Sequence, residues 1–232
     1  RILPDFEASL LGTKYVHDLG INEDAHRSQV AEAVARQLGG TTLGDVRRIL
    51  DLTQNDRDAT VREAGERCAQ AIIDGRLDDK DSLAFVDEFV NGGALSRATA
   101  IALDQVTSGK SADAIETLTD VLAPVDALDT YADGNGVVWR EFTSYVSRAL
   151  YNRLLAKEGE EVRLVPDAYF AAQLLMASAL IDSGRQEEAL GFARRAQDLC
   201  PFDVSGTLRA ARCFELDHDF EAAANELIQQ LE

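Results

Sequence analysis

Apolar residues recur at intervals of three and four positions along most of this chain. Val61, Ala64, Cys68 and Ile72 form one such series, which places them on a single face of a helix. Comparable amphipathic segments cover 28–38, 59–74, 83–90, 95–107 and 112–121. Stretches with the alternation typical of strands are scarce, so the pattern predicts an all-α fold.

Glycines divide the predicted helices from one another. The breaks fall at Gly39, Gly75, Gly92, Gly109 and Gly184. The linkers are only a few residues long, so successive helices are expected to pack as antiparallel neighbours. The least regular stretch is 124–166, where the pattern predicts a long helix over about 137–155 followed by a charged loop over 157–161.

Small residues recur at a fixed spacing in the C-terminal part of the chain. Ala177, Gly184, Ala189, Ala196 and Pro201 stand at offsets of 0, 7, 12, 19 and 24. Two helices that cross closely need small side chains at their contact, and glycine permits a tight turn between them. Proline then ends the second helix because it has no N–H for the hydrogen-bond ladder.

The same spacing occurs twice more. The further copies are Ala211, His218 and Ala223, which lie 34 residues later, and Ala102, Gly109, Ala114 and Val121. His218 stands where the turn glycine is expected. The 75 residues from Ala102 to Ala177 equal two periods plus seven, which predicts an inserted or enlarged unit between the copies.

This arrangement resembles the tetratricopeptide repeat, most strongly over 170–231 and more weakly over 95–121. The resemblance implies antiparallel helix pairs stacked as a right-handed superhelix, an α-solenoid. It divides the chain into an N-terminal helical region, 1–94, and repeats over 95–232 with an irregular insert at about 124–166. Gly75 lies 34 residues before Gly109 and hints at a degenerate repeat in the N-terminal region, although Lys80 stands where a packing alanine is expected.

The resemblance also implies a concave groove lined by the first helix of each unit. The corresponding residues are Leu174, Ser178, Ile181, Leu208, Arg212 and Glu215, extended by Ser96, Thr99, Leu103 and Ser205. This apolar and small-polar surface suits an extended peptide or a partner helix. The alternative is that several of these side chains pack against a neighbouring segment. Family members that grip chaperone C-terminal carboxylates use several basic groove residues, and only Arg212 is basic here.

The charge of the chain limits its partners. With 41 acidic and 23 basic residues, the formal net charge is -18. Such a field repels phosphate backbones, which disfavours nucleic acid, and it favours cationic partners or simply a well-solvated surface. No apolar run is long enough to span a membrane, so no membrane contact is expected. The sequence opens on Arg1 rather than Met, which suggests a fragment or a processed product.

The three cysteines, Cys68, Cys200 and Cys213, are widely spaced and form no CxxC or His-paired motif. Neither a disulfide framework nor a zinc site is indicated, and the cysteines are expected to be small buried apolar side chains. A reducing, cytoplasmic compartment fits them best.

A calcium loop is one alternative for the segment around Gly136. Asp129, Asp133, Asn135 and Glu141 supply oxygen ligands there, but their spacing does not fit an EF-hand. A polar turn capping a helix that carries Trp139 is favoured instead.

Two further alternatives lie in the N-terminal region. A helix-turn-helix over 30–50 would carry Val46 and Ile49 inside and Arg47 and Arg48 towards phosphates, but an ordinary helix pair is favoured. A metal cluster would use His17, Asp18, Glu23, Asp24 and His26. These residues lack metal-ligand spacing on one helical face.

No catalytic motif and no cofactor or metal site is indicated. The sequence predicts a non-enzymatic protein–protein interaction scaffold that holds a protein or peptide in the groove. The alternative is a transcriptional regulator with a helix-turn-helix-like N-terminal segment and repeats that sense or recruit a partner. A divergent enzyme would require a deep polar pocket with perturbed acids.

Overall fold

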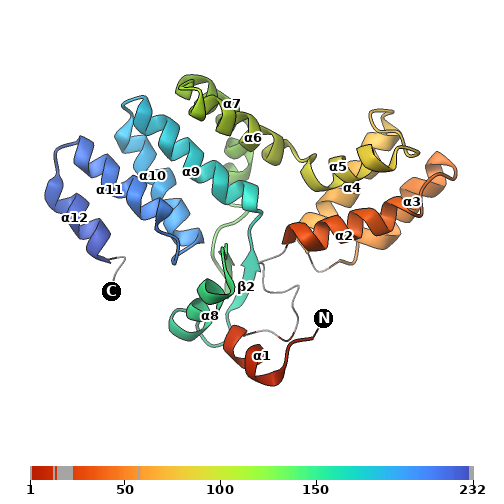
Figure 1. The fold of residues 1–232 in the computed structure, drawn as a ribbon, viewed down its shortest axis with the longest axis horizontal. Helices are drawn as coiled ribbons and strands as arrows, with labels where there is room; N and C mark the ends of the chain where they lie inside the picture. The colour runs from red at the N-terminus through yellow and green to blue at the C-terminus, as the bar shows by residue number, and fades with distance from the viewer. Residues whose placement is uncertain (1, 13, 15–22, 57, 230–232) are drawn as a thin grey trace. The chain divides into compact units, whose positions relative to one another are not determined.

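The computed structural model describes every residue except 1, 13, 15–22, 57 and 230–232 (Figure 1). The described residues form twelve helices and two short strands, which confirms the prediction of a mainly helical protein. The chain divides into two compact units, one of residues 22–97 and one that joins residues 1–21 to residues 98–232. The sequence placed a boundary between residues 94 and 95.

The unit of residues 22–97 contains four helices and the start of a fifth. They are α2 (Glu23–Ala35), α3 (Thr42–Thr53), α4 (Ala59–Ile73), α5 (Ser82–Asn91) and the first residues of α6 (Ala94–Thr107). The apolar face predicted for α4 lies in the core, where Val61, Ala64, Cys68 and Ile72 are buried. Phe85 and Phe89 of α5 complete this core, with ring centroids 5.8 Å apart. Side chains of Thr41, Asp58 and Asp81 cap the N-termini of α3, α4 and α5.

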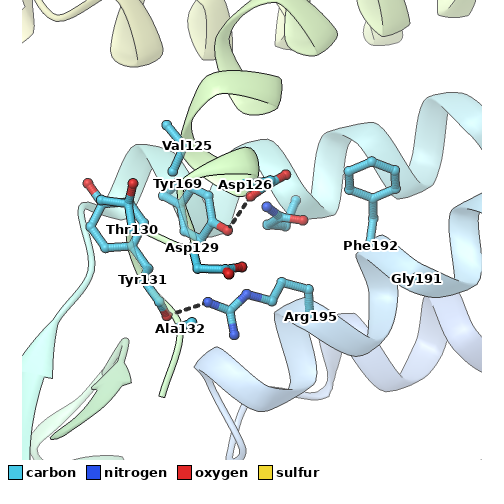
Figure 2. A pocket seen from close by; sticks show the side chains of 11 residues that line it. Val125, Asp126, Asp129, Thr130, Tyr131, Ala132, Tyr169, Gly191, Phe192 and Arg195 are labelled. Carbon is cyan, nitrogen blue, oxygen red and sulfur yellow. Dashed lines mark hydrogen bonds between the residues drawn. The ribbon is translucent and has the colours of Figure 1, made fainter. Parts of the chain in front are cut away.

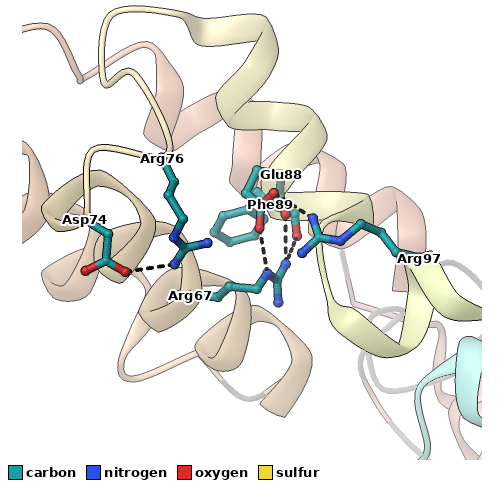
Figure 3. Close-up of polar contacts among 6 residues, drawn as sticks. All are labelled: Arg67, Asp74, Arg76, Glu88, Phe89 and Arg97. Atoms are coloured by element: carbon teal, nitrogen blue, oxygen red, sulfur yellow. Dashed lines mark hydrogen bonds and ion pairs between the residues drawn. The ribbon is translucent and has the colours of Figure 1, made fainter. Parts of the chain in front are cut away.

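A cationic side chain caps the C-terminal end of α5 (Figure 3). Arg67 of α4 donates to the backbone carbonyls of Glu88 and Phe89 at 2.8 and 3.1 Å. The Glu88 carboxylate accepts from Arg67 at 3.3 Å and from Arg97 at 2.9 Å. The Glu88 carbonyl also accepts from the Gly92 N–H at 2.9 Å, so Arg67 adds to the hydrogen bonds at the end of α5 and ties α5 to α4.

The other unit contains a run of helices in which α7 and α9 to α12 pack on one another in order. They are the remainder of α6, α7 (Ser111–Ala127), α9 (Asp167–Asp182), α10 (Gln186–Leu199), α11 (Val204–Leu216) and α12 (Phe220–Gln229). α7 packs on α9, α9 on α10, α10 on α11 and α11 on α12, and α9 also contacts α11 (Figure 1). Ala177, Ala189 and Ala196 are almost completely buried at these contacts, where only small side chains allow the helices to approach.

The turns between paired helices share one geometry. Gly109, Gly184 and His218 all have left-handed backbones, with φ of +72°, +72° and +63°. In each turn this residue donates its N–H to the carbonyl three residues back, and the next residue donates to the carbonyl five residues back. This hydrogen-bond pair is the Schellman motif, which ends a helix by satisfying its last carbonyls. His218 therefore adopts the conformation that glycine adopts in the other two turns.

The prediction for the irregular stretch is wrong in part. Residues 137–140 form strand β1 (Val137–Arg140) rather than helix, and β2 (Glu161–Leu164) begins within the predicted charged loop. The two strands are parallel, with Val137 opposite Glu161. The helix α8 (Tyr145–Leu154) begins only after Ser144, whose side chain forms a capping box with Ser147. β-Branched residues after a glycine turn favour a strand, but its partner lies far along the chain and leaves no local pattern.

The remaining helix, α1 (Asp5–Leu11), packs on α8 through the side containing Ala8 and Leu11. A small core beside the strands holds Val138, Phe142 and Tyr151. The segment between α7 and α9 is thus a separate β–α–β element, and the two helices that flank it contact each other directly.

Candidate functional site

The predicted groove residues lie on two helices that contact each other. Leu174, Ser178 and Ile181 are on α9, and Leu208, Arg212 and Glu215 are on α11. The α9 residues are half-buried. On α11, Leu208 is 55% exposed, and the neighbouring Val204 is 52% exposed. We name these six predicted residues together with Val204 the α9–α11 face.

One residue that sequence reasoning missed fastens this face together. Arg209 of α11 donates from Nε to the Leu174 carbonyl at 3.0 Å and to the Ser178 hydroxyl at 2.8 Å. Its Nη1 donates to the Ser205 carbonyl at 2.9 Å within α11. Burial lowers the pKa of Arg209 from its usual value. The available signal was a basic residue between small and apolar neighbours in TLRAA, which does not by itself indicate a partner on another helix.

The other groove residues make local contacts. Arg212 and Glu215 form an exposed ion pair at 2.6 Å, and Thr99 donates to the Ala168 carbonyl at 3.3 Å. Leu103 on α6 is 50% exposed, whereas Ser96 belongs to the unit of residues 22–97. An exposed ion pair contributes little stability, so Arg212 and Glu215 remain available to a partner.

A pocket that sequence reasoning did not find lies beside the C-terminal end of α7. Its volume is about 430 Å³. The side chains around it come from the end of α7 and the turn after it, from α9 and from α10 (Figure 2). The lining residues are Val125, Asp126, Asp129, Thr130, Tyr131, Ala132, Tyr169, Gln173, Gly191, Phe192 and Arg195. They extend from Val125 to Arg195 along the sequence, so no local pattern could have assembled them.

A hydrogen-bonded aromatic cluster builds one wall of the pocket. The Tyr169 hydroxyl donates to Asp126 Oδ1 at 2.7 Å. Arg195 Nη2 donates to the Tyr131 carbonyl at 2.5 Å. The Tyr131 ring lies 4.7 Å from the Tyr169 ring and 5.1 Å from that of Trp139. Burial raises the pKa of Tyr169, so its hydroxyl stays protonated and continues to donate at neutral pH.

The turn after α7 places a second carboxylate at the pocket. Asp129 has a left-handed backbone, with φ of +48°. Its N–H donates to the Asp126 carbonyl and the next N–H donates to the Val125 carbonyl, both at 3.1 Å, which is again a Schellman turn. Asp126 and Asp129 are both exposed at the pocket's edge.

Gln173 gives the pocket a polar group without a partner. Its side chain is 1% exposed, and its Nε2 forms no hydrogen bond with any described residue. Leaving a buried amide donor unsatisfied costs roughly 1–3 kcal/mol. Such a cost in a residue that lines a pocket is expected where a bound molecule supplies the missing acceptor.

In the segment considered as a calcium loop, the candidate ligand Asp133 forms hydrogen bonds within the protein. Asp133 accepts from the Trp139 backbone at 2.8 Å and pairs with Arg140 at 2.7 Å, so it organises the turn before β1. The favoured interpretation is corrected too, because Trp139 lies in β1 and not in a helix. Within the described part of the chain, no three His, Cys, Asp or Glu side chains are grouped to hold a metal ion.

The helix-turn-helix segment corresponds to the end of α2 and the start of α3. Asp45 is buried and accepts from the backbone of Gly39 and Gly40, both at 2.9 Å. Arg48 donates to the Gln37 carbonyl at 2.7 Å, and Arg47 is exposed. This segment therefore uses Arg48 to close its own turn.

The proposed metal cluster is only partly visible. His17 and Asp18 lie outside the described residues, as do the side chains of Glu23 and Asp24. His26 lies 3.2 Å from Asp56 Oδ1, a contact between α2 and the segment before α4.

The cysteines are free and buried. Burial raises the pKa of Cys68 and of Cys200 to about 12, so both remain neutral thiols at physiological pH. A neutral buried thiol is neither a nucleophile nor a metal ligand.

No helix in the part of the chain described by the structure has the length and apolar character needed to cross a membrane. A scan against protein-family models and searches of curated proteins and of solved structures found no match to this chain.

Proposed function

We propose that this protein is a helical-repeat scaffold that binds a partner peptide or helix on the α9–α11 face. The repeats form a tetratricopeptide-like right-handed superhelix, and the chain acts by holding the partner rather than by catalysis. The observation that carries the proposal is the exposed Leu208 on a pair of helices that Arg209 holds in register.

The exposed apolar side chains favour a partner with apolar anchors. Val204, Leu208 and Arg212 follow one another at intervals of four residues and share one side of α11. A partner that covers the exposed apolar side chains of Val204 and Leu208 removes them from water, which favours binding. The Arg212–Glu215 pair next to it provides a polar border.

The cross-link by Arg209 favours recognition on a rigid surface. Because Arg209 joins α11 to two positions on α9, the two helices need not rearrange when a partner binds. A preformed surface loses less conformational entropy on binding than a mobile one.

The repeated turns and buried alanines support the superhelical arrangement. Three turns share one left-handed geometry, and alanines occupy the closest helix contacts. Stacked helix pairs of this kind present long, concave binding surfaces.

The test is affinity capture with mass spectrometry, comparing the native chain with Leu208→Glu and Leu174→Glu. Both changes place a charge on the α9–α11 face and are expected to remove the partner. Leu83→Glu is the matched control, because Leu83 is 84% exposed and belongs to the other unit. A partner retained by both groove variants would exclude this face as the binding site.

A further inference from the structure

We propose that the pocket between α7, α9 and α10 binds a ligand with an ammonium group next to a carbonyl or carboxylate oxygen. A free amino acid and the amino terminus of a peptide both supply this chemistry. The pocket is separate from the α9–α11 face. On α9, Tyr169 and Gln173 point about 80–180° away from Leu174, Ser178 and Ile181 around the helix axis, since each residue advances about 100°.

Two carboxylates at the pocket can accept hydrogen bonds from the ammonium group of the ligand. Asp126 and Asp129 come from the same turn, and neither forms an ion pair with another described residue. Figure 2 shows both carboxylates and the Arg195 guanidinium turned towards the same space. An ammonium group carries three donors and a positive charge, so it can be shared between two carboxylates. The Tyr169 ring already faces a cation of the protein, because the Arg195 guanidinium carbon lies 5.9 Å from its centroid, so the two carboxylates carry the recognition of the ammonium group.

Two side chains at the pocket can donate hydrogen bonds to the ligand oxygen. Gln173 lines the pocket at 1% exposure, and its amide nitrogen has no hydrogen-bond partner. Arg195 uses Nη2 for the Tyr131 carbonyl, and a guanidinium has further N–H donors in the same plane. A carbonyl or carboxylate oxygen in the pocket would satisfy the buried amide and face a positive charge.

The size and the other lining residues of the pocket limit which ligands it can hold. The volume of about 430 Å³ lies in the lower part of the range for small-molecule sites. Val125, Ala132 and Phe192 are apolar, and Gly191 contributes no side chain, which leaves room for a ligand side chain. A phosphate is an unsuitable ligand, because the pocket has two carboxylates and only one guanidinium, and the carboxylates would repel the phosphate.

The experiment is isothermal titration of the full chain with four sets of probes. They are free L-amino acids, their amides, tripeptides with a free amino terminus and the same tripeptides acetylated. At least one free amino acid or free tripeptide is expected to bind, and acetylation to weaken it by about tenfold or more, because it removes the ammonium charge. Binding of the free acid but not of its amide or a peptide identifies an amino-acid site. Binding of free tripeptides identifies a peptide-terminus site.

Two variants link the binding to the pocket. Gln173→Leu and Asp129→Asn are each expected to weaken binding by about tenfold, the equivalent of one charge-assisted hydrogen bond. Asn tolerates the left-handed backbone at position 129, so this variant keeps the fold and decides the question if Gln173→Leu does not fold. Asp113→Asn on the exposed side of α7 makes the same charge change outside the pocket and serves as the control.

The proposal is overturned if no free amino acid or free tripeptide binds at millimolar concentration. It is also overturned if acetylated and free peptides bind equally, or if Asp129→Asn binds as well as Asp113→Asn. Leu208→Glu is expected to leave titration of the pocket unchanged, which separates this test from that of the α9–α11 face.

Discussion

Arg209 Nε on α11 donates to Ser178 Oγ on α9 at 2.8 Å, and this bond joins two helices whose first turns lie more than 30 residues apart. Ser178 in turn donates to the Leu174 carbonyl at 3.0 Å. A half-buried guanidinium on α11 thus forms hydrogen bonds with both a side chain and the backbone of α9. The packing of α11 against α9 therefore depends on this polar contact as well as on apolar side chains.

Replacing Arg209 with Ala is expected to lower the free energy of unfolding by about 2–3 kcal/mol, because three hydrogen bonds to a charged group are lost. Arg212→Ala removes a guanidinium from an exposed pair and is expected to cost under about 1 kcal/mol. Urea denaturation followed by circular dichroism measures both. Equal losses for the two variants would show that Arg209 does not fasten α11 to α9.

Ala189→Leu or Ala196→Leu is expected to destabilise the protein by about 1–3 kcal/mol, because the larger side chain overpacks a buried helix contact. Ala189 is 0% and Ala196 1% exposed. Ala224→Leu on α12 is the control, since Ala224 is exposed. Thermal melts compare the three variants. Melting temperatures that match that of the control would count against the repeat assignment.

The left-handed turns predict opposite effects at two equivalent positions. Gly184→Ala is expected to destabilise by about 0.5–1 kcal/mol, because the left-handed backbone costs an L-residue about 1–2 kcal/mol and the lower unfolded-state entropy of Ala offsets about 0.5–1 kcal/mol of it. Beyond the two neighbouring residues, no heavy atom lies within 4 Å of a Cβ built there, so the backbone accounts for the cost. His218→Gly relieves the same strain but adds unfolded-state entropy worth about 0.5–1 kcal/mol, leaving a net gain near 0.5 kcal/mol. Chemical denaturation of both variants checks the signs, and a stabilising Gly184→Ala would contradict the shared turn geometry.

The buried thiols predict a loss of stability at high pH. Burial raises the pKa of Cys68 from 9.0 to about 12 in the folded state. The thiol's contribution is therefore complete below about pH 9, the unfolded value, and declines as the pH rises from 9 to 12. Cys68→Ala is expected to reduce the slope of stability against pH in this window by about 1.4 kcal/mol per pH unit.

The control for this slope is Ile72→Val in the same core cluster. It removes a methyl group and lowers stability without removing a titrating group. Stability is measured by urea denaturation at several pH values between 8 and 10.5, all chosen within the predicted window or just below it. If Cys68→Ala and Ile72→Val have the same slope as the native chain, the Cys68 thiol does not titrate with folding.

Most of the helices could be predicted from the sequence, because their signals lie within a few neighbouring residues. The face formed by Val61, Ala64, Cys68 and Ile72 was visible because helical periodicity repeats within a few residues, and the structure buries all four. Gly109 and Gly184 marked turns because few other residues adopt a left-handed backbone, and His218 occupies the same turn in spite of its side chain. The helix predicted over 137–144 was wrong, because β1 is stabilised by a partner strand beginning at Glu161.

The sequence by itself determined most of the helical segments, the glycine turns and the small residues at close helix contacts, since each depends on neighbours within one or two helical turns. Only the tertiary structure decided which distant groups meet. It brought Arg209 to Ser178, and it assembled Asp126, Gln173 and Arg195 around one pocket. Such groups are joined by folding rather than by spacing, because a hydrogen bond between helices depends on packing that no local pattern encodes.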